Sequence, residues 1–418
     1  MTHAPPGYVC SEDGTRADVR TAPWGCPVCG GPWDLDFTPD PAAVLEPAAG
    51  PNSLWRYGSV LPLPGAFGVS LAEGHTPLVS LAERIHAKLD FLMPTLSFKD
   101  RGAVMLVELA RRLAPERVVA DSSGNAGTSV AAYCARAGLA CEVFVPEGTS
   151  EKKTAQMRAH GAVVRVIPGG REAAAQAART AADAPGVFYA SHVFNPYFLH
   201  GTKTYVYEVW EELGGRLPEA LVVPVGNGTL LLGAALAVEE LARRGVRPPA
   251  LIAVQAEAVA PLARAFAAGA EDADPVEQRP TLAEGIAIPA PPRARQILAA
   301  VRKSGGTFLT VTDSRLREAQ QDLAGRGLFV EPTAAACWAA VGPSAPGDPL
   351  QGRTAVLPLC GAGAKTDPPP PPPRPPPPPP RGWGGGGGTA PHPPPHPHPH
   401  PTPHYMSEIR EPPADHVW

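Results

Sequence analysis

Three short stretches of this sequence combine polar residues with glycine, as catalytic or ligand-binding segments do. In the first, Pro94-Thr-Leu-Ser-Phe-Lys99-Asp-Arg-Gly precedes an apolar helical stretch expected to begin at Ala103. A lysine on a partly buried turn has a lowered pKa, and its neutral amine can then condense with an aldehyde. Taken alone this signal is weak, because most such lysines are ordinary surface or salt-bridged residues.

The second and third stretches are glycine-rich turns that follow apolar runs. In Asp121-Ser-Ser-Gly-Asn-Ala-Gly127, small residues let backbone amides approach a planar ligand, and Asn125 offers a hydrogen bond to a ring oxygen. Gly226-Asn-Gly-Thr229 precedes a helix expected from Leu230, and amides at a helix N-terminus suit a phosphate. The spacing is not that of a dinucleotide fingerprint and no Walker lysine follows, so NAD and ATP are both disfavoured.

An α/β fold must position these stretches. Apolar runs begin at Val118, Cys141, Val163, Leu221 and Leu251, and helical stretches such as 127–137, 151–160 and 230–244 separate them. Strands that alternate with helices of this length predict a mostly parallel sheet covered on both faces. Ligands of such folds bind at the carboxyl ends of the strands, where the two glycine-rich turns lie.

Composition divides the chain into three parts. Residues 1–38 form a short, turn-rich module with three cysteines, and residues 55–366 are long enough for two lobes, the smaller at about 103–205. Residues 367–418 are mostly proline, glycine and histidine and cannot bury apolar surface. This tail is expected to be disordered, with metal capture by its histidines or docking to a proline-recognising domain as alternatives.

Charge and cysteine usage limit the partners. The formal net charge is −4, with acidic and basic residues mixed, so no nucleic-acid or anionic-membrane footprint is present and a small-molecule partner is favoured. No apolar run reaches the roughly 18 residues of a spanning helix, and the first residues lack a signal-peptide pattern. Seven cysteines indicate reduced thiols. We expect a cytoplasmic protein.

The order of the motifs resembles the fold type II, tryptophan-synthase-β-like group of pyridoxal-phosphate (PLP) enzymes. Lysine, asparagine loop, glycine-rich loop and a terminal Cys360-Gly-Ala-Gly-Ala-Lys365 follow one another as in that group. Within it the chain is most similar to threonine synthase, through Glu73-Gly-His-Thr-Pro-Leu, Asn195-Pro and Gly201-Thr-Lys-Thr204. Ala126 follows Asn125 where related serine and threonine dehydratases usually carry histidine, which favours the synthase branch.

The resemblance implies a two-lobed α/β enzyme, a homodimer, that converts O-phospho-L-homoserine and water to L-threonine and phosphate. Lys99 would hold PLP as a Schiff base and then move the α proton, and Asn125 would bond the phenolic oxygen. The remaining cofactor contacts would come from Gly226, Asn227, Gly228 and Thr229 at the phosphate and Cys360 at the pyridine nitrogen. The substrate carboxylate would lie near Ser122, Ser123 and Thr128.

Two departures concern the substrate. The family carries an arginine for the substrate's phosphate where this chain has Phe198, and an asparagine upstream of it where this chain has His192. His192, Lys203 or Arg101 would then have to supply the missing contacts. An alternative activity therefore stays open, namely β-elimination or β-replacement on serine, threonine, phosphoserine or a similar amino acid. A non-catalytic protein that binds partners through its tail is a third interpretation.

Two further features allow two interpretations each. The amino-terminal module resembles the zinc ribbon of some threonine synthases, with Cys10, Asp13, Cys26 and Cys29 as ligands. Because Asp13 replaces a cysteine, the alternatives are a structural zinc ion and a degenerate ribbon that folds without metal. Glu331 opens a helix, and it either caps that helix or shapes the cofactor pocket.

Overall fold

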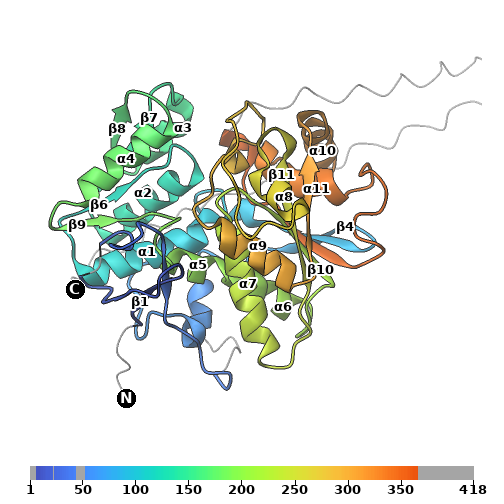
Figure 1. Cartoon of the computed structure of the whole chain (residues 1–418), viewed down its shortest axis with the longest axis horizontal. Helices are drawn as coiled ribbons and strands as arrows, with labels where there is room; N and C mark the ends of the chain where they lie inside the picture. Colours follow the sequence, from blue (N-terminus) through green and yellow to red (C-terminus); the bar gives the residue numbers. More distant parts are fainter. Residues whose placement is uncertain (1–5, 22, 44–51, 366–418) are drawn as a thin grey trace, which may run out of the picture. The chain divides into compact units, whose positions relative to one another are not determined.

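Two sheets form the framework of the chain, as the computed structural model shows for residues 6–21, 23–43 and 52–365 (Figure 1). The smaller sheet has the order β8-β7-β6-β9 and is parallel throughout. Its strands are β6 Arg117–Ala120, β7 Cys141–Pro146, β8 Val163–Ile167 and β9 Val187–Tyr189. Its helices are α1 Lys99–Leu113, α2 Asn125–Ala137, α3 Glu151–Ala159 and α4 Arg171–Ala182.

The larger sheet has the order β12-β11-β10-β13-β5-β4, and only the edge strand β4 runs antiparallel to its neighbour. Its strands are β4 Leu78–Ala82, β5 Ile85–Lys88, β10 Ala220–Pro224, β11 Ala250–Ala256, β12 Thr307–Val311 and β13 Ala355–Pro358. The accompanying helices are α5 Tyr197–Thr202, α6 Thr204–Glu212, α7 Thr229–Ala242, α8 Pro261–Ala267, α9 Ala294–Lys303, α10 Asp313–Gly325 and α11 Pro332–Val341. Short 3-10 turns span Leu54–Val60, Asp90–Leu92, Glu257–Val259, Glu284–Ile286 and Gly363–Lys365.

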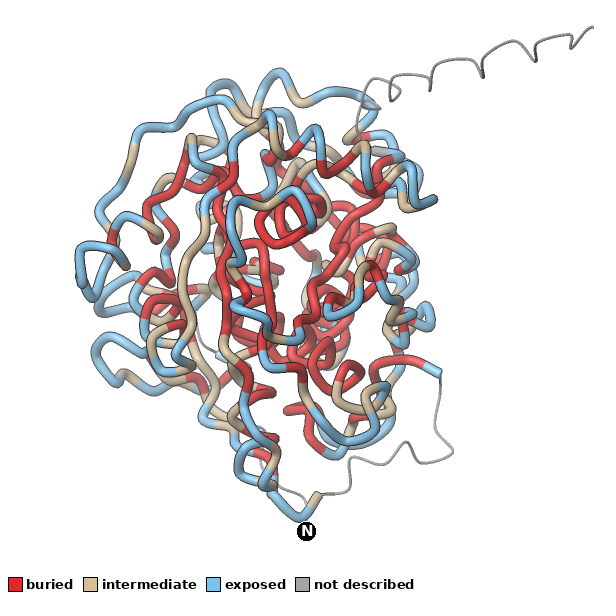
Figure 2. Tube along the Cα trace, turned by 90° about the vertical axis from the view of Figure 1, so that its right-hand side faces the viewer, coloured by how far each residue is buried: buried red, intermediate tan, exposed pale blue. Residues whose placement is uncertain are grey.

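The prediction of an α/β fold with mostly parallel sheets is confirmed. The central strands are apolar on both faces because helices cover both, and β10 is buried along its whole length. Figure 2 shows the buried residues gathered inside the described part of the chain, with exposed residues on outer helices and loops. No helix of the described residues combines the length and apolarity that crossing a bilayer requires.

Helix α1 begins earlier than the sequence pattern predicts, at Lys99 and not at Ala103. The Asp100 carboxylate accepts hydrogen bonds from the backbone amide of Thr95 at 2.7 Å and from its hydroxyl at 2.5 Å. This local bonding folds residues 95–98 against the first helical turn. Lys99 is therefore fixed by a helix and does not lie on a turn ahead of one.

Helices α1 and α5 cross closely at two glycines. A Cβ atom on Gly102 would lie 2.4 Å from the Phe198 ring, and one on Gly201 would lie 1.9 Å from the carbonyl oxygen of Arg101. Only glycine permits this approach. Phe198 is completely buried as a result, with its ring against the helix that carries Lys99.

A buried ion-pair network connects α1 with α6 and the larger sheet. The Arg101 guanidinium donates to Asp90 at 2.8 and 2.9 Å and to Glu208 at 2.6 and 2.8 Å. The ammonium of Lys88 lies 3.0 Å from Glu208 and 2.8 Å from Glu212. Three of the five side chains, those of Lys88, Asp90 and Arg101, are inaccessible to solvent, so their charges depend on one another for compensation.

The amino-terminal module is a small antiparallel sheet of order β2-β1-β3, with β1 Tyr8–Cys10, β2 Arg16–Ala17 and β3 Trp33–Leu35. Trp33 is buried and stacks on Tyr8 with ring centroids 5.6 Å apart. The division predicted at residues 1–38, 55–366 and 367–418 remains a prediction. The tail and its histidines lie outside the described residues.

Candidate active site

The carbonyl and amide groups around Lys99 are fixed to the segment that contains Cys360. The amide of Phe98 donates to the Cys360 carbonyl at 2.9 Å, and the amide of Ala362 donates to the Leu96 carbonyl at 3.0 Å. Ser97 and Gly361 form a β-bridge between the two segments. Lys99 and Cys360, which are 261 positions apart in the sequence, therefore lie side by side at the centre of the fold.

The Lys99 amine lies in a mixed environment of aromatic rings and one hydroxyl. Its Nζ atom is 3.5 Å from Oγ1 of Thr229 and 4.6 and 5.4 Å from the ring centroids of Phe98 and Phe198. Burial lowers the pKa of Lys99 to about 8, although the negative charge of Glu331 opposes the shift. The neutral form, which attack on an aldehyde requires, is therefore far more abundant near neutral pH than it is for an ordinary lysine.

This pKa predicts a pH profile for the cofactor-free protein. Because an ordinary lysine titrates near pH 10.4, lowering the pKa to about 8 makes the reactive amine abundant at lower pH. We expect the rate of PLP uptake, followed by absorbance, to rise with pH and to reach half its maximum near pH 8. A midpoint above pH 10 would show that the Lys99 amine is solvated like a surface lysine.

The glycine-rich turn after β10 forms a tight cradle at the N-terminus of α7. A Cβ atom on Gly226 would lie 2.9 Å from the Cα atom of Ile286, and Gly228 has a φ of 74° with Ile297 packed against it. The hydroxyl of Thr202 donates to the Thr229 carbonyl at 2.9 Å, and this hydrogen bond helps to fix the end of the turn. The first amides of a helix lack intrahelical partners, so this turn presents donors suited to an anion.

Asn125 and Glu331 meet across the two sheets. Asn125 is the first residue of α2, and its side-chain amide donates to both carboxylate oxygens of Glu331, at 3.1 and 3.0 Å. Glu331 occupies the N-cap position of α11, yet its side chain makes no capping hydrogen bond. Glu331 is therefore the N-cap residue at the start of α11, as predicted, but its side chain bonds Asn125 and makes no hydrogen bond to the helix amides.

His192 lies at the same site but stays neutral. Burial, together with the charges of Lys99 and Arg171, lowers the pKa of His192 well below its ordinary value. Its Nε2 atom is 3.5 Å from the Asn227 side-chain amide, and its ring centroid is 5.8 Å from that of Phe198. A neutral imidazole cannot supply the cation that an arginine would have brought to this segment.

Two residues that the sequence offered as substrate ligands are engaged elsewhere. The Lys203 ammonium donates to Glu240 at 2.9 and 3.1 Å and to the Val60 carbonyl at 2.7 Å, completely buried beneath α7. Arg101 is saturated by its two buried carboxylates. Moving either cation toward a substrate would leave a buried carboxylate without its counter-charge. The structure does not place Lys203 or Arg101 beside the Lys99 amine.

The remaining predicted residues lie on the loop and helix that follow β6. Ser122 and Ser123 are half-buried, and the Gly124 amide donates to the Ser122 hydroxyl at 3.3 Å. Thr128 is buried in the first turn of α2. Gly127 is required here, since a Cβ atom would lie 2.0 Å from the Ser122 carbonyl oxygen. Cys360 is buried as a thiol, because burial raises its pKa well above its ordinary value.

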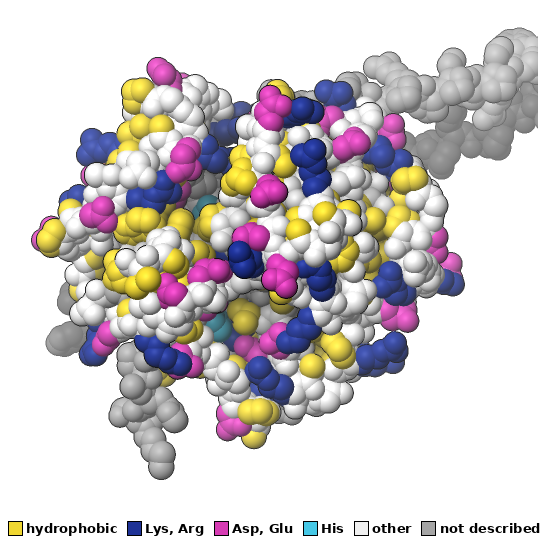
Figure 3. All heavy atoms as spheres, viewed as in Figure 1, with side chains coloured by type: hydrophobic (Ala, Val, Ile, Leu, Met, Phe, Trp, Pro, Cys, Tyr) yellow, Lys and Arg dark blue, Asp and Glu magenta, His cyan; other side chains and the backbone are white. Residues whose placement is uncertain are grey.

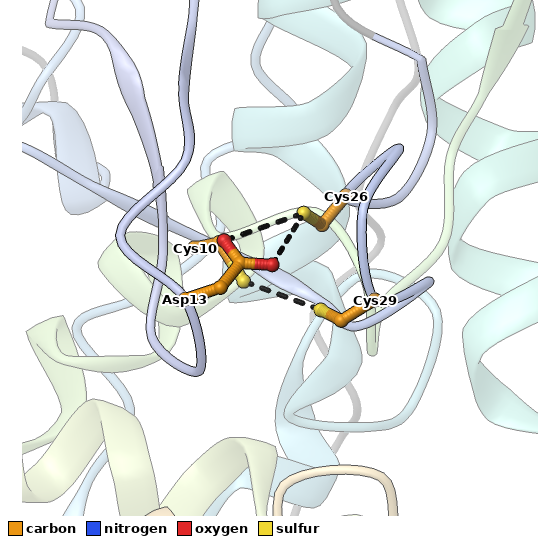
Figure 4. Close-up of side chains that lie close together, drawn as sticks. All are labelled: Cys10, Asp13, Cys26 and Cys29. Carbon is orange, nitrogen blue, oxygen red and sulfur yellow. Dashed lines mark hydrogen bonds between the residues drawn. The ribbon is translucent and has the colours of Figure 1, made fainter.

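The four predicted metal ligands of the amino-terminal module converge. One ligand atom from each of Cys10, Asp13, Cys26 and Cys29 lies within 4.8 Å of the others (Figure 4). The Cys26 thiol donates to an Asp13 oxygen at 3.3 Å, and the Cys10 and Cys29 sulfur atoms are 3.4 Å apart. All seven cysteines of the chain are free, as expected for reduced thiols.

The module is connected to the segment next to His192 through a residue that the sequence analysis missed. Arg293, buried just before α9, donates to the Val193 carbonyl at 2.8 Å, to Asp34 at 2.7 Å and to the Trp33 carbonyl. The Trp33 amide donates to the Phe194 carbonyl at 3.1 Å. No local pattern around Arg293 predicts this role, because all its protein partners except Gln296 are distant in sequence.

Comparison with known proteins assigns the class that this fold and site define. The profile of the "pyridoxal-phosphate dependent enzyme" family matches residues 69–361, and the chain belongs to that family. It is thus a PLP-dependent enzyme, a lyase, and PLP is its cofactor.

Curated relatives of this chain include threonine synthases. That of Methanosarcina acetivorans is 33% identical over 341 residues, covering 78% of this chain and 84% of the relative. That of Mycobacterium leprae is 36% identical over 310 residues, covering 71% and 83%. Among solved structures, a threonine deaminase from T.th. has a TM-score of 0.58 and 29% identity, covering 69% of this chain and 92% of that one. Maize serine racemase, with a TM-score of 0.61 and 19% identity over 69% and 88%, shares the fold.

Proposed function

We propose that the chain is a threonine synthase, which converts O-phospho-L-homoserine and water to L-threonine and phosphate with PLP held by Lys99. The observation that carries the proposal is the half-buried Lys99 amine with a lowered pKa, 3.5 Å from Thr229 of the glycine-rich turn. The similarity to threonine synthases supports the reaction.

The residues around Lys99 fit PLP. Gly226 and Gly228 leave a cradle that a side chain would fill, and the amides of residues 226–229 are suited to the cofactor phosphate. Asn125 is positioned by Glu331 for the phenolic oxygen, and Cys360 lies beside Lys99 for the pyridine nitrogen. The hydroxyl of Ser97 is buried with no hydrogen-bond partner among the described residues, so one donor of this segment is available to a ligand.

Bound PLP supplies an electron sink for carbanion chemistry at the substrate. Lys99 holds the cofactor and, once a substrate amine has taken its place, its neutral amine can accept the α proton. Ser122, Ser123 and Thr128 would orient the substrate carboxylate from the loop after β6 and the start of α2. The rings of Phe98 and Phe198 lie next to the amine and cover part of it.

One observation favours a second activity. Phe198 is buried against Gly102, and His192 is neutral, so neither supplies a charge for a substrate phosphate. In PLP-dependent β-elimination or β-replacement the substrate is serine, threonine or phosphoserine, none of which carries a phosphate on a γ carbon. Phe198 favours this alternative because it cannot bind such a phosphate.

A substrate panel separates the two activities. The purified holoenzyme is incubated with O-phosphohomoserine, serine, threonine and O-phosphoserine, and phosphate, keto acid and threonine are quantified. Threonine and phosphate formed in equal amounts from O-phosphohomoserine are the expected result. Turnover confined to the three other substrates would replace the synthase with the alternative lyase.

We also propose that the cysteine module binds a structural zinc ion through Cys10, Asp13, Cys26 and Cys29. The convergence of these ligand atoms within 4.8 Å supports the proposal, and thiolate and carboxylate oxygens are zinc ligands. The free thiols favour a cytoplasmic location, and we infer a homodimer from the family resemblance.

The unusual aspartate provides a sharp test of the zinc proposal. Since thiolate ligands dominate structural zinc sites, Asp13→Cys should retain one zinc ion per chain and tighten its binding against a competing chelator. Zinc is quantified by mass spectrometry of the metal, and Cys29→Ser is the matched loss-of-ligand variant. Equal and negligible zinc in wild type and in Asp13→Cys would identify the module as a degenerate ribbon.

A further inference from the structure

Arg171 is placed at the active-site edge of the smaller sheet. It is the first residue of α4, and three residues separate it from the end of β8. Because β6, β8 and β9 are parallel, their carboxyl ends share one edge with the loops that carry Ser122 and His192. Strand β8 is two strands from β6, or about 10 Å, so an extended arginine side chain can reach from one loop to the other.

No carboxylate neutralises Arg171 among the residues that the structure describes. The neighbouring Glu172 pairs with Arg179 at 2.5 Å, and Arg171 itself is exposed. The positive charge of Arg171 nevertheless reaches the site, since it contributes to the lowered pKa values of both Lys99 and His192. The charge of Arg171 also lowers the pKa of the half-buried Asp121, against the larger opposing effect of burial.

The other cations around the site are committed to carboxylates. Arg101 is bound by Asp90 and Glu208, Lys203 by Glu240, and Lys153 by Glu284 at 2.5 Å. The Lys99 amine is reserved for the cofactor in the proposed function, and His192 is neutral. Arg171 at the start of α4 is thus a cation near the site with no carboxylate partner among the described residues, whereas Phe198 on α5 carries no charge.

We propose that Arg171 is a specificity-determining residue of this site and binds the phosphate ester at the end of the substrate side chain. The inference rests on the proposed function and deepens it. The planar guanidinium can bind two phosphate oxygens at once, which neither Phe198 nor a neutral histidine can do. The smaller sheet thus supplies the substrate's anion contact, while the larger sheet supplies the turn proposed for the cofactor phosphate.

The test is the affinity of the holoenzyme for the non-hydrolysable phosphonate analogue of O-phosphohomoserine, measured by calorimetry. Arg171→Gln removes the charge and keeps the length, and should weaken binding about 10- to 100-fold. Arg171→Lys should recover part of this loss. The matched control is Arg165→Gln on β8, which removes an exposed arginine paired with Glu142 and should bind like wild type.

Two measurements on the same proteins keep the conclusions separate. Equal affinity of wild type and Arg171→Gln for the analogue, or equal weakening by Arg165→Gln, overturns the role of Arg171. In turnover with O-phosphohomoserine, Arg171→Gln should raise KM more than it lowers kcat, with unchanged affinity for unphosphorylated serine. Failure of wild type to release phosphate, whatever its affinity for the analogue, refutes the proposed function and not the anion contact.

Discussion

Replacing Lys99 with alanine will eliminate the visible absorption band of the lysine-bound cofactor and lower turnover by about 10⁴-fold. The reason is the arrangement around Lys99, which holds one amine with a pKa of about 8 between Thr229 and two aromatic rings. The buried ammonium of Lys203 is engaged by Glu240 and cannot take its place. Absorption spectra of the purified variants, before and after borohydride reduction, check this result.

The control for Lys99 is Lys303→Ala, which removes an exposed lysine paired with Glu239. This variant should keep the absorption band and wild-type turnover. Peptide mapping after borohydride treatment should locate the reduced cofactor on the Lys99 peptide. A Lys99→Ala protein that still traps the cofactor covalently would assign the attachment site to another lysine.

Replacing Arg101 with methionine will lower the free energy of unfolding by about 3 to 5 kcal/mol. The substitution leaves Asp90 and Glu208 buried without their shared cation, although Lys88 still contacts Glu208. Burial alone would raise the pKa of Glu208, but the charges of Arg101 and Lys88 lower it to about 2. Urea unfolding at neutral pH measures the loss.

The pH dependence of the lost stability shows whether Arg101→Met acts by removing the counter-charge of the buried carboxylates or only by removing packing contacts. A carboxylate with a lowered pKa stabilises the fold above its unfolded pKa of about 4.3 and loses this contribution as the pH falls toward 2. The gap between wild type and Arg101→Met should therefore narrow below about pH 4. The control Arg16→Met removes an exposed ion pair with Asp36 and should cost no more than about 1 kcal/mol.

The sequence predicted the fold well where local pattern decides it. Apolar runs beginning at Val118, Cys141 and Leu221 coincide with β6, β7 and most of β10, because buried parallel strands carry continuous apolar residues. The run beginning at Val163 coincides with β8, although this edge strand is largely exposed. The predicted start of α1 was wrong by four residues. The helix begins earlier because Asp100 bonds Thr95, a contact that hydrophobic periodicity cannot indicate.

The candidate site was less predictable because it depends on contacts between distant segments. Asn125 and Glu331 are separated by 206 positions, so their hydrogen bonds could not be read from either motif alone. The position of Lys203 in a family-like segment suggested a substrate ligand, whereas Glu240 on α7 decides where its charge lies. Arg171 lies in a stretch without a motif, and only the order of the strands shows that it follows a strand at the carboxyl edge of the smaller sheet.

Surface charge follows the expectation from composition. Acidic and basic side chains are interspersed over the face in Figure 3, without a continuous region of one sign. The pattern on this face agrees with the nearly balanced composition, which has a formal net charge of −4.

The contact between Asp34 and Arg293 also sets the order in which the newly made chain can assemble. The two residues are 259 positions apart. The amino-terminal module therefore emerges from the ribosome long before Arg293, its later partner, is synthesised. At usual translation rates this interval is roughly 10 to 50 seconds. During that time strand β3 of the module lacks the hydrogen bonds that Arg293 later donates to Trp33 and Asp34. Assembly of the active-site segment around Val193 is completed only after this delay.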